Sequence, residues 1–214
     1  MLIAEELLLL SLDPVRGRPL NGSESVISVC LLGALVAELG VAGRVDWVGS
    51  RFVPVGPRPV GLLGEVHEAL EADRPRRAAP QLRRMDRVLR SARRRVIDGL
   101  VDAGVLGRER RRPWLPTAHR LLDQAARAEP LGRVRSAAAT HDAVDARTAV
   151  LLALSGPARL LEVVADKPHA HAKQRIAQAA ELVPAVEVVK RVIAEAAAAA
   201  ASVAAIAAST SAVS

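Results

Sequence analysis

Aromatic side chains are nearly absent from this chain, whose 214 residues include two tryptophans, one phenylalanine and no tyrosine. Half of the residues are nonetheless hydrophobic, so the core must be built from leucine, valine, isoleucine and alanine. β-Sandwiches and barrels favour aromatic and β-branched residues on their pleated surfaces, so this composition favours helices. The same scarcity argues against binding of single-stranded nucleic acid, which uses aromatic rings to stack bases.

Cysteine is almost as rare. Cys30 is the only one, which excludes a disulfide framework. It lies in the apolar run 29–32, where a cysteine behaves as a small buried hydrophobe. We therefore expect Cys30 to be structural.

Catalytic and metal-binding patterns are also missing. His169 and His171 lie two residues apart, so on a helix they face different ways. Neither a cysteine nor a carboxylate pattern completes a metal site around them. The other histidines are isolated in the sequence: His67, His119 and His141. We expect no metal, no cofactor and no enzymatic activity.

No apolar run reaches the 18 or so residues that a membrane span needs. A signal peptide is equally poorly matched, because Glu5 and Glu6 stand where such a segment would be basic. The alanine-rich stretch 194–208 is only weakly hydrophobic. We therefore predict one domain over residues 1–208 with a disordered tail at 209–214, in a cytoplasmic protein whose contact with the membrane is peripheral.

Lysine is scarce, with only three residues, so nearly all of the basic charge is carried by arginine. The formal net charge of +7 points toward nucleic acid, anionic lipid or an acidic protein surface. A genome biased toward arginine codons would also produce this excess. The positions of the arginines therefore carry the argument, and their total does not.

Arginines concentrate in residues 81–101, QLRRMDRVLRSARRRVIDGLV, where seven arginines and two aspartates give a net charge of +5. Apolar residues recur there every three or four positions, which predicts a single helix with one buried face. At about 100° per residue, Arg93 lies only about 60° from the centre of that face, and Arg90 lies beside it one turn earlier. A charged side chain at the margin of a core must extend to water or meet an anion. Arg94 points further outward.

Elsewhere the pattern predicts a mainly helical fold with two hairpins. The first hairpin turns at Gly49-Ser50, and the second spans residues 105–116, with a basic tip at 108–112 and an apolar return at 113–116. A serine, Ser23 or Ser25, is expected to cap the helix that ends at Leu39. Residues 132–140 are expected to form a loop. The remaining helices are expected at 4–12, 62–72, 118–128, 142–154, 158–165, 170–182 and from 185 onward.

Four segments together resemble the Golgi phosphoprotein 3 family. They are LIAEELLLL at 2–10, GALVAELGVAGRV at 33–45, LRSARRRVIDGLVDAGVL at 89–106 and DARTAVLLAL at 145–154. The similarity covers nearly the whole chain and rests on the order and spacing of these segments. It implies a single-domain helical bundle wrapped by amphipathic helices, which binds phosphatidylinositol 4-phosphate at a basic, membrane-facing surface.

The resemblance also implies site residues. Two family arginines that lie three apart fall on Arg90 and Arg93, to which we add Arg94. The family's other two pocket positions, a tryptophan and an arginine, fall at about Ser23 and Leu32 and are not matched. The family's apolar hairpin, which enters the bilayer, corresponds to 105–116. Its membrane-contacting residues would be Arg110, Arg111, Arg112, Trp114 and Leu115. Trp114 also fits a second interpretation, as a buried anchor of the hairpin.

Three functions are therefore compared. The first is a non-enzymatic peripheral membrane protein that binds phosphatidylinositol 4-phosphate or another anionic lipid headgroup through the basic helix. The alternative is a nucleic-acid-binding protein that uses the same helix and hairpin, since arginine favours phosphates of any kind. Against it, Arg90 and Arg93 face the core margin instead of pointing outward into a groove. A third interpretation, also implied by the family, is a scaffold for short protein tails.

Overall fold

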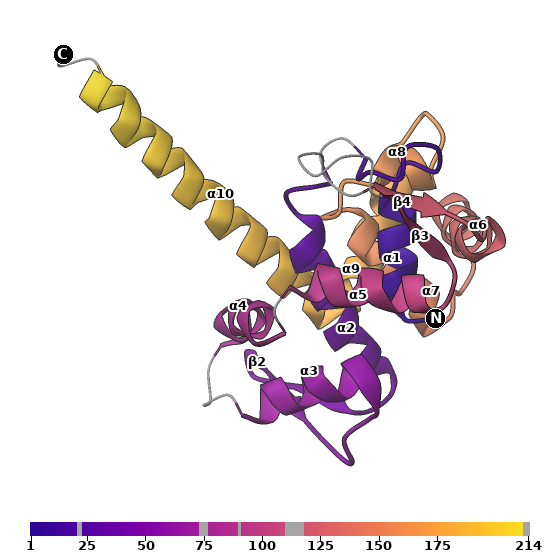
Figure 1. The fold of residues 1–214 in the computed structure, drawn as a ribbon, viewed down its shortest axis with the longest axis horizontal. Coiled ribbons are helices and arrows are strands. Elements are labelled where there is room, and N and C mark those ends of the chain that lie inside the picture. The colour runs from indigo at the N-terminus through magenta and orange to yellow at the C-terminus, as the bar shows by residue number, and fades with distance from the viewer. Residues whose placement is uncertain (21–22, 73–76, 90, 110–117, 212–214) are drawn as a thin grey trace.

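The computed structural model describes residues 1–20, 23–72, 77–89, 91–109 and 118–211. In these ranges the chain forms ten helices and two separate two-stranded antiparallel sheets (Figure 1). This arrangement confirms the prediction of a mainly helical fold with two hairpins.

The elements follow one another with short connections. The helices are α1 (Ile3–Ser11), α2 (Ile27–Val41), α3 (Gly61–Glu71), α4 (Ala78–Val88), α5 (Ala92–Asp102), α6 (Ala125–Ala139), α7 (Ala146–Ser155), α8 (Leu161–Val164), α9 (Ala170–Glu181) and α10 (Pro184–Ser211). The strands are β1 (Val45–Val48), β2 (Arg51–Pro54), β3 (Leu106–Glu109) and β4 (Ala118–Leu121).

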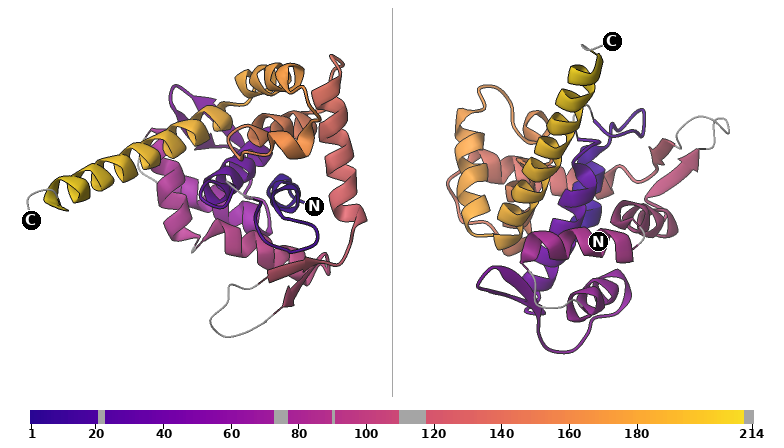
Figure 2. Two further views of the ribbon diagram at one scale, coloured as in Figure 1. Left: turned by 90° about the horizontal axis from the view of Figure 1, so that it is seen from above. Right: turned by 90° about the vertical axis from the view of Figure 1, so that its left-hand side faces the viewer.

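Helices α1 and α2 form the centre of the core. Leu7 to Leu10 are fully buried, and α2 is buried from Cys30 through Leu39. A helix that is hydrophobic on all sides must be surrounded by other elements. The other helices accordingly pack around this pair, while the far end of α10 extends away from the body (Figures 1 and 2).

A cluster of four charged residues, here called the buried ion cluster, joins α1, α2, α6 and α7. Glu6 accepts from Arg133 at 3.0 Å and from Arg147 at 3.3 Å, and Arg147 also donates to Glu38 at 2.7 Å. The other carboxylate oxygen of Glu38 accepts from the backbone N–H of Ile3 at 2.8 Å. Both glutamates are buried, and buried charges are tolerated only when they are paired in this way.

The first hairpin is confirmed. Strands β1 and β2 pair with Val48 opposite Arg51, which leaves Gly49-Ser50 as the two-residue turn. Gly49 has a φ of +62°, a backbone conformation that glycine adopts without steric cost.

The prediction of one continuous helix over 81–101 is wrong. Helix α4 ends at Val88 and α5 begins at Ala92, with Ser91 between them at a φ of +77°. The Ser91 hydroxyl accepts the backbone N–H of Arg94 at 3.4 Å and so caps α5. The predicted buried face is nevertheless confirmed, because its six apolar residues are all buried: Leu82, Met85, Leu89, Ala92, Val96 and Leu100.

Three further assignments are corrected. Residues 118–128, expected as a helix, divide into strand β4 and the start of α6. Residues 132–140, expected as a loop, belong to α6 as far as Ala139, because buried Pro130 and Val134 hold this helix against the core. Helix α2 is also not capped by a serine side chain: its N-cap is Val26, and the Ser23 hydroxyl donates to the carbonyl of Leu20.

Within the described ranges, no helix combines the length and the apolar character that crossing a bilayer requires. The predicted boundary between a domain at 1–208 and a tail at 209–214 stays a prediction.

Candidate anion-binding site

One flank of α5 carries polar side chains beside its buried face. Val96 and Leu100 anchor the helix in the core, and Ile97 packs partly buried against it. Arg93 and Ile97 are four residues apart, as are Arg94 and Asp98, so the two pairs share this flank. Burial of the apolar face therefore fixes where these arginines lie.

The β3–β4 ribbon faces the same flank. Leu106 pairs with Leu121, and both are buried. Side chains alternate between the two faces of a strand, so the next pair out on the buried face is Arg108 with His119, which are directly opposite each other. The two leucines thus direct Arg108 and His119 toward α5.

These side chains surround a hollow of about 450 Å³, here called the polar hollow. It is lined by Ser91, Arg93, Arg94, Ile97, Asp98, Arg108 and His119. Three arginines and one aspartate give it a net formal charge of +2 while His119 is neutral. The arrangement can hold an anion whose oxygens accept several hydrogen bonds.

The arginines around α5 differ in what they already contact. Arg95 pairs with Glu65 of α3, and Arg108 pairs with Asp98 across the polar hollow. Arg93, by contrast, has a buried Nε without a hydrogen-bond partner among the residues that the structure describes. An arginine cannot lose its charge in a protein, so Arg93 keeps a buried, charged donor that no described residue satisfies.

The electrostatics of the hollow act most clearly on His119. Burial lowers the pKa of this imidazole below its ordinary value of 6.5, and the charges of Arg93 and Arg108 lower it further, while Asp98 opposes them. His119 is therefore neutral at pH 7 when the hollow holds no anion.

The predicted site residues have different outcomes. Arg93 and Arg94 line the polar hollow, whereas Arg90 lies outside the described residues. The predicted membrane-contacting residues, Arg110, Arg111, Arg112, Trp114 and Leu115, also lie outside them. At the two positions where the family's other pocket residues would fall, Ser23 and Leu32 are buried and do not line the hollow.

Sequence reasoning missed the role of His119, which it treated as an isolated residue, and that of Asp98. A usable signal was present. Polar residue 119 lies two positions from apolar residue 121, just as polar 108 lies two positions from apolar 106. This alternation indicates two paired strands with one apolar and one polar cross-strand pair. The low β-propensity of Ala118-His119-Arg120 concealed it.

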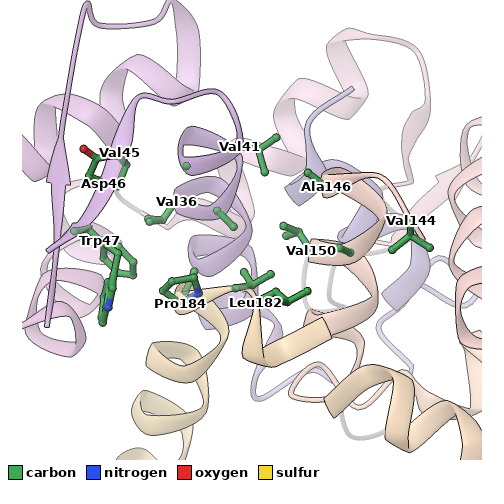
Figure 3. Close-up of a pocket in the computed structure, with 16 residues that line it drawn as sticks. Val36, Val41, Val45, Asp46, Trp47, Val144, Ala146, Val150, Leu182 and Pro184 are labelled. Carbon is green, nitrogen blue, oxygen red and sulfur yellow. The ribbon is translucent and has the colours of Figure 1, made fainter. Parts of the chain in front are cut away.

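A second concavity, here called the apolar groove, has a volume of about 530 Å³ and lies between α2, α7, β1, β2 and the start of α10. Val36, Val150 and Leu182 lie along it, with Trp47 at one side (Figure 3). The Trp47 ring packs against Phe52, with centroids 5.1 Å apart. Asp46 is the one charged residue among the described residues that line it, so it offers an anion no cation.

No group of three or more histidine, cysteine, aspartate or glutamate side chains in the described part of the chain is arranged to hold a metal ion. Cys30 is buried in α2, and this burial raises the pKa of its thiol to about 12. The thiol is therefore protonated at physiological pH and unsuited to act as a nucleophile.

The model of the family Golgi phosphoprotein 3 (GPP34) matches residues 3–196, from the first residue of α1 into α10. The chain belongs to the Golgi phosphoprotein 3 family. No curated protein sequence is similar enough to the chain to count as a match. The Golgi phosphoprotein 3 match includes α5 and the β3–β4 ribbon, and therefore both sides of the polar hollow. It also includes all four members of the buried ion cluster.

Proposed function

We propose that this protein is a non-enzymatic peripheral membrane protein that binds an anionic lipid headgroup, phosphatidylinositol 4-phosphate or a similar phosphate, in the polar hollow. The observation that carries the proposal is Arg93, whose buried Nε has no partner among the described residues at the edge of a cationic hollow. Membership of the Golgi phosphoprotein 3 family is consistent with it. The site acts at the cytoplasmic face of a membrane.

Magnitudes indicate how many contacts such binding needs. A basic residue near an anionic membrane surface contributes about 1 kcal/mol, so Arg93, Arg94 and Arg108 supply about 3 kcal/mol. A micromolar dissociation constant requires about 8 kcal/mol. Insertion of Trp114 and Leu115 would add roughly 2 to 4 kcal/mol. We therefore propose that Arg90 and the hairpin residues 110–115 complete the contact.

Vesicle co-sedimentation tests this function. The wild-type protein and Arg93→Ala are compared on neutral vesicles, on vesicles with a phosphodiester lipid, and on vesicles with a phosphoinositide. We expect wild type to bind both anionic kinds, and Arg93→Ala to lose about five- to tenfold in affinity, because it removes the unfilled donor and one charge.

Arg95→Ala is the matched control. It removes the same charge from the same helix, but Arg95 pairs with Glu65 away from the hollow. We expect it to retain affinity within about twofold. Equal losses in the two variants would show that only total charge matters and would remove the proposed site. If wild type ignores all anionic vesicles and binds duplex DNA at moderate salt, the nucleic-acid alternative replaces this proposal.

A further inference from the structure

Two buried nitrogen atoms around the polar hollow lack hydrogen-bond partners in the described part of the chain: Nε of Arg93 and Nδ1 of His119. A buried polar atom without a partner is energetically unfavourable. Arg93 comes from α5 and His119 from β4, two elements that are separate in sequence. Because both residues line the hollow, an anion held there would lie beside an unfilled donor group on each side.

His119 is held in place from several directions. Its backbone N–H donates to the carbonyl of Gly17 at 3.1 Å, and its strand partner is Arg108. A Cβ at position 17 would lie 2.4 Å from the carbonyl oxygen of His119, and Gly17 has a φ of +62°. The N-terminal loop therefore approaches β4 closely because residue 17 is glycine.

The charged groups around His119 come from three elements. Arg93 and Asp98 face it from α5, and Arg108 faces it from β3. The N-terminal loop, which contacts the His119 backbone through Gly17, carries exposed Arg16 and Arg18 together with the carboxylate of Asp13. Arg93 and Arg108 lower the pKa of His119 and Asp98 opposes them, so protonation of His119 is unfavourable until a negative charge enters the hollow.

We propose that His119 is a headgroup-contacting residue which becomes protonated when a phosphate binds, so that binding takes up a proton. The inference rests on the proposed function and adds a proton-linked donor to that site. Arg93 supplies a fixed charge and a donor at every physiological pH, whereas the imidazolium of His119 donates through Nδ1 to a second phosphate oxygen. A phosphate group has several acceptor oxygens and satisfies both sides of the hollow at once.

Affinity for a phosphate should increase as pH falls. Without ligand, the pKa of His119 is below 6.5 because of burial and the neighbouring arginines. A bound phosphate brings negative charge, which raises the pKa. Between these two values the complex holds one more proton than the free protein, so affinity increases as pH falls, by at most about tenfold per pH unit. Above both values the affinity no longer changes with pH.

A phosphate monoester complicates the measurement, because its own second pKa is about 6 and its protonation weakens binding. Vesicles containing a phosphodiester lipid avoid this problem, since their charge is constant over the range used. The dissociation constants of wild type and His119→Gln are therefore measured on phosphodiester vesicles from pH 8 to pH 5.5, and then on phosphoinositide vesicles. Glutamine keeps a neutral hydrogen-bond donor and removes the titration.

We expect wild type to bind severalfold more tightly at pH 5.5 than at pH 8, and His119→Gln to show a flat profile over the same range. Identical profiles in the two proteins would overturn the inference. So would a His119→Gln variant that is equally weakened at every pH while its circular dichroism and melting temperature are unchanged. Absence of wild-type binding at every pH would instead refute the proposed function.

Nuclear magnetic resonance gives a readout without a membrane and separates a lipid headgroup from free phosphate. The His119 imidazole signal, assigned by its loss in His119→Gln, is titrated alone, with inorganic phosphate, and with a soluble short-chain phosphoinositide. We expect the phosphoinositide to raise the pKa of His119. An equal effect of inorganic phosphate at the same concentration would identify a general phosphate site. No shift with either ligand would refute proton uptake by His119.

Discussion

The polar hollow and the apolar groove are of similar size, about 450 and 530 Å³, yet they are built differently. The groove is walled by side chains that also form the core, such as Val36, Phe52 and Val150, each at most 4% exposed. The hollow is lined mainly by polar side chains, and two of them, Arg93 and His119, each have a buried nitrogen without a hydrogen-bond partner among the described residues. The two concavities therefore differ in the polarity of their lining side chains and not in their size.

Phe52→Ala should produce the largest effect and should separate stability from binding. Phe52 is 4% exposed and packs on Trp47 in the wall of the apolar groove. Its backbone N–H and carbonyl bind the Gln81 side chain, contacts that alanine retains. We expect a loss of about 3 to 5 kcal/mol in the free energy of unfolding, measured by urea denaturation.

Binding to anionic vesicles by the folded fraction of Phe52→Ala should equal that of wild type. A loss of less than about 1 kcal/mol in stability would show that the groove wall is not part of the core. Specific weakening of vesicle binding would show that the groove takes part in membrane contact, and the comparison between the two concavities would fail.

Asp98→Asn should have an intermediate effect. It should strengthen the binding of anionic vesicles at the polar hollow, whereas Arg93→Ala should weaken it. The Asp98 carboxylate pairs with Arg108 and reduces the positive charge available to an anion. Asparagine keeps the shape and releases Arg108, so affinity for anionic vesicles should increase about fivefold, in line with about 1 kcal/mol for a charge near the surface. The gain should shrink at high salt. Unchanged or weaker binding would mean that the Asp98–Arg108 pair positions the site.

Ser91→Gly should produce the smallest effect. Ser91 has a φ of +77° and a ψ of +96°, which a side chain makes costly and glycine does not. Replacing a serine cap by glycine costs only a few tenths of a kcal/mol. We expect a net stabilisation of about 0.5 kcal/mol, visible as a higher melting temperature. A lower melting temperature would show that the Ser91 cap outweighs the backbone strain.

Much of the fold was predictable, because the apolar spacing in 81–101 and the turn at Gly49-Ser50 are local signals. The break at Ser91 was not, since neither glycine nor proline marks it and the apolar residues on both sides keep a helical spacing. Helix α6 was concealed by Pro130 and Gly132, two residues that ordinarily interrupt helices. Its packing against the core overrides them.

The candidate site was only partly predictable for a related reason. The position of Arg93 at the edge of the core follows from helical geometry alone. The juxtaposition of Arg93 with His119 depends on the pairing of β3 with β4, whose strands are separated by residues 110–117. Such long-range pairing leaves little trace in any one segment.

The buried ion cluster links the unfolding of distant parts of the chain. Glu6 and Glu38 lie in the first fifth of the chain, whereas their partners Arg133 and Arg147 lie in the last two fifths. A fold that lacks Arg133 and Arg147 would leave the buried carboxylates of Glu6 and Glu38 without their cations, which is strongly destabilising. Early and late segments must therefore melt together, and a protein cut in two between α3 and α6 should recover its shape only when both pieces are mixed.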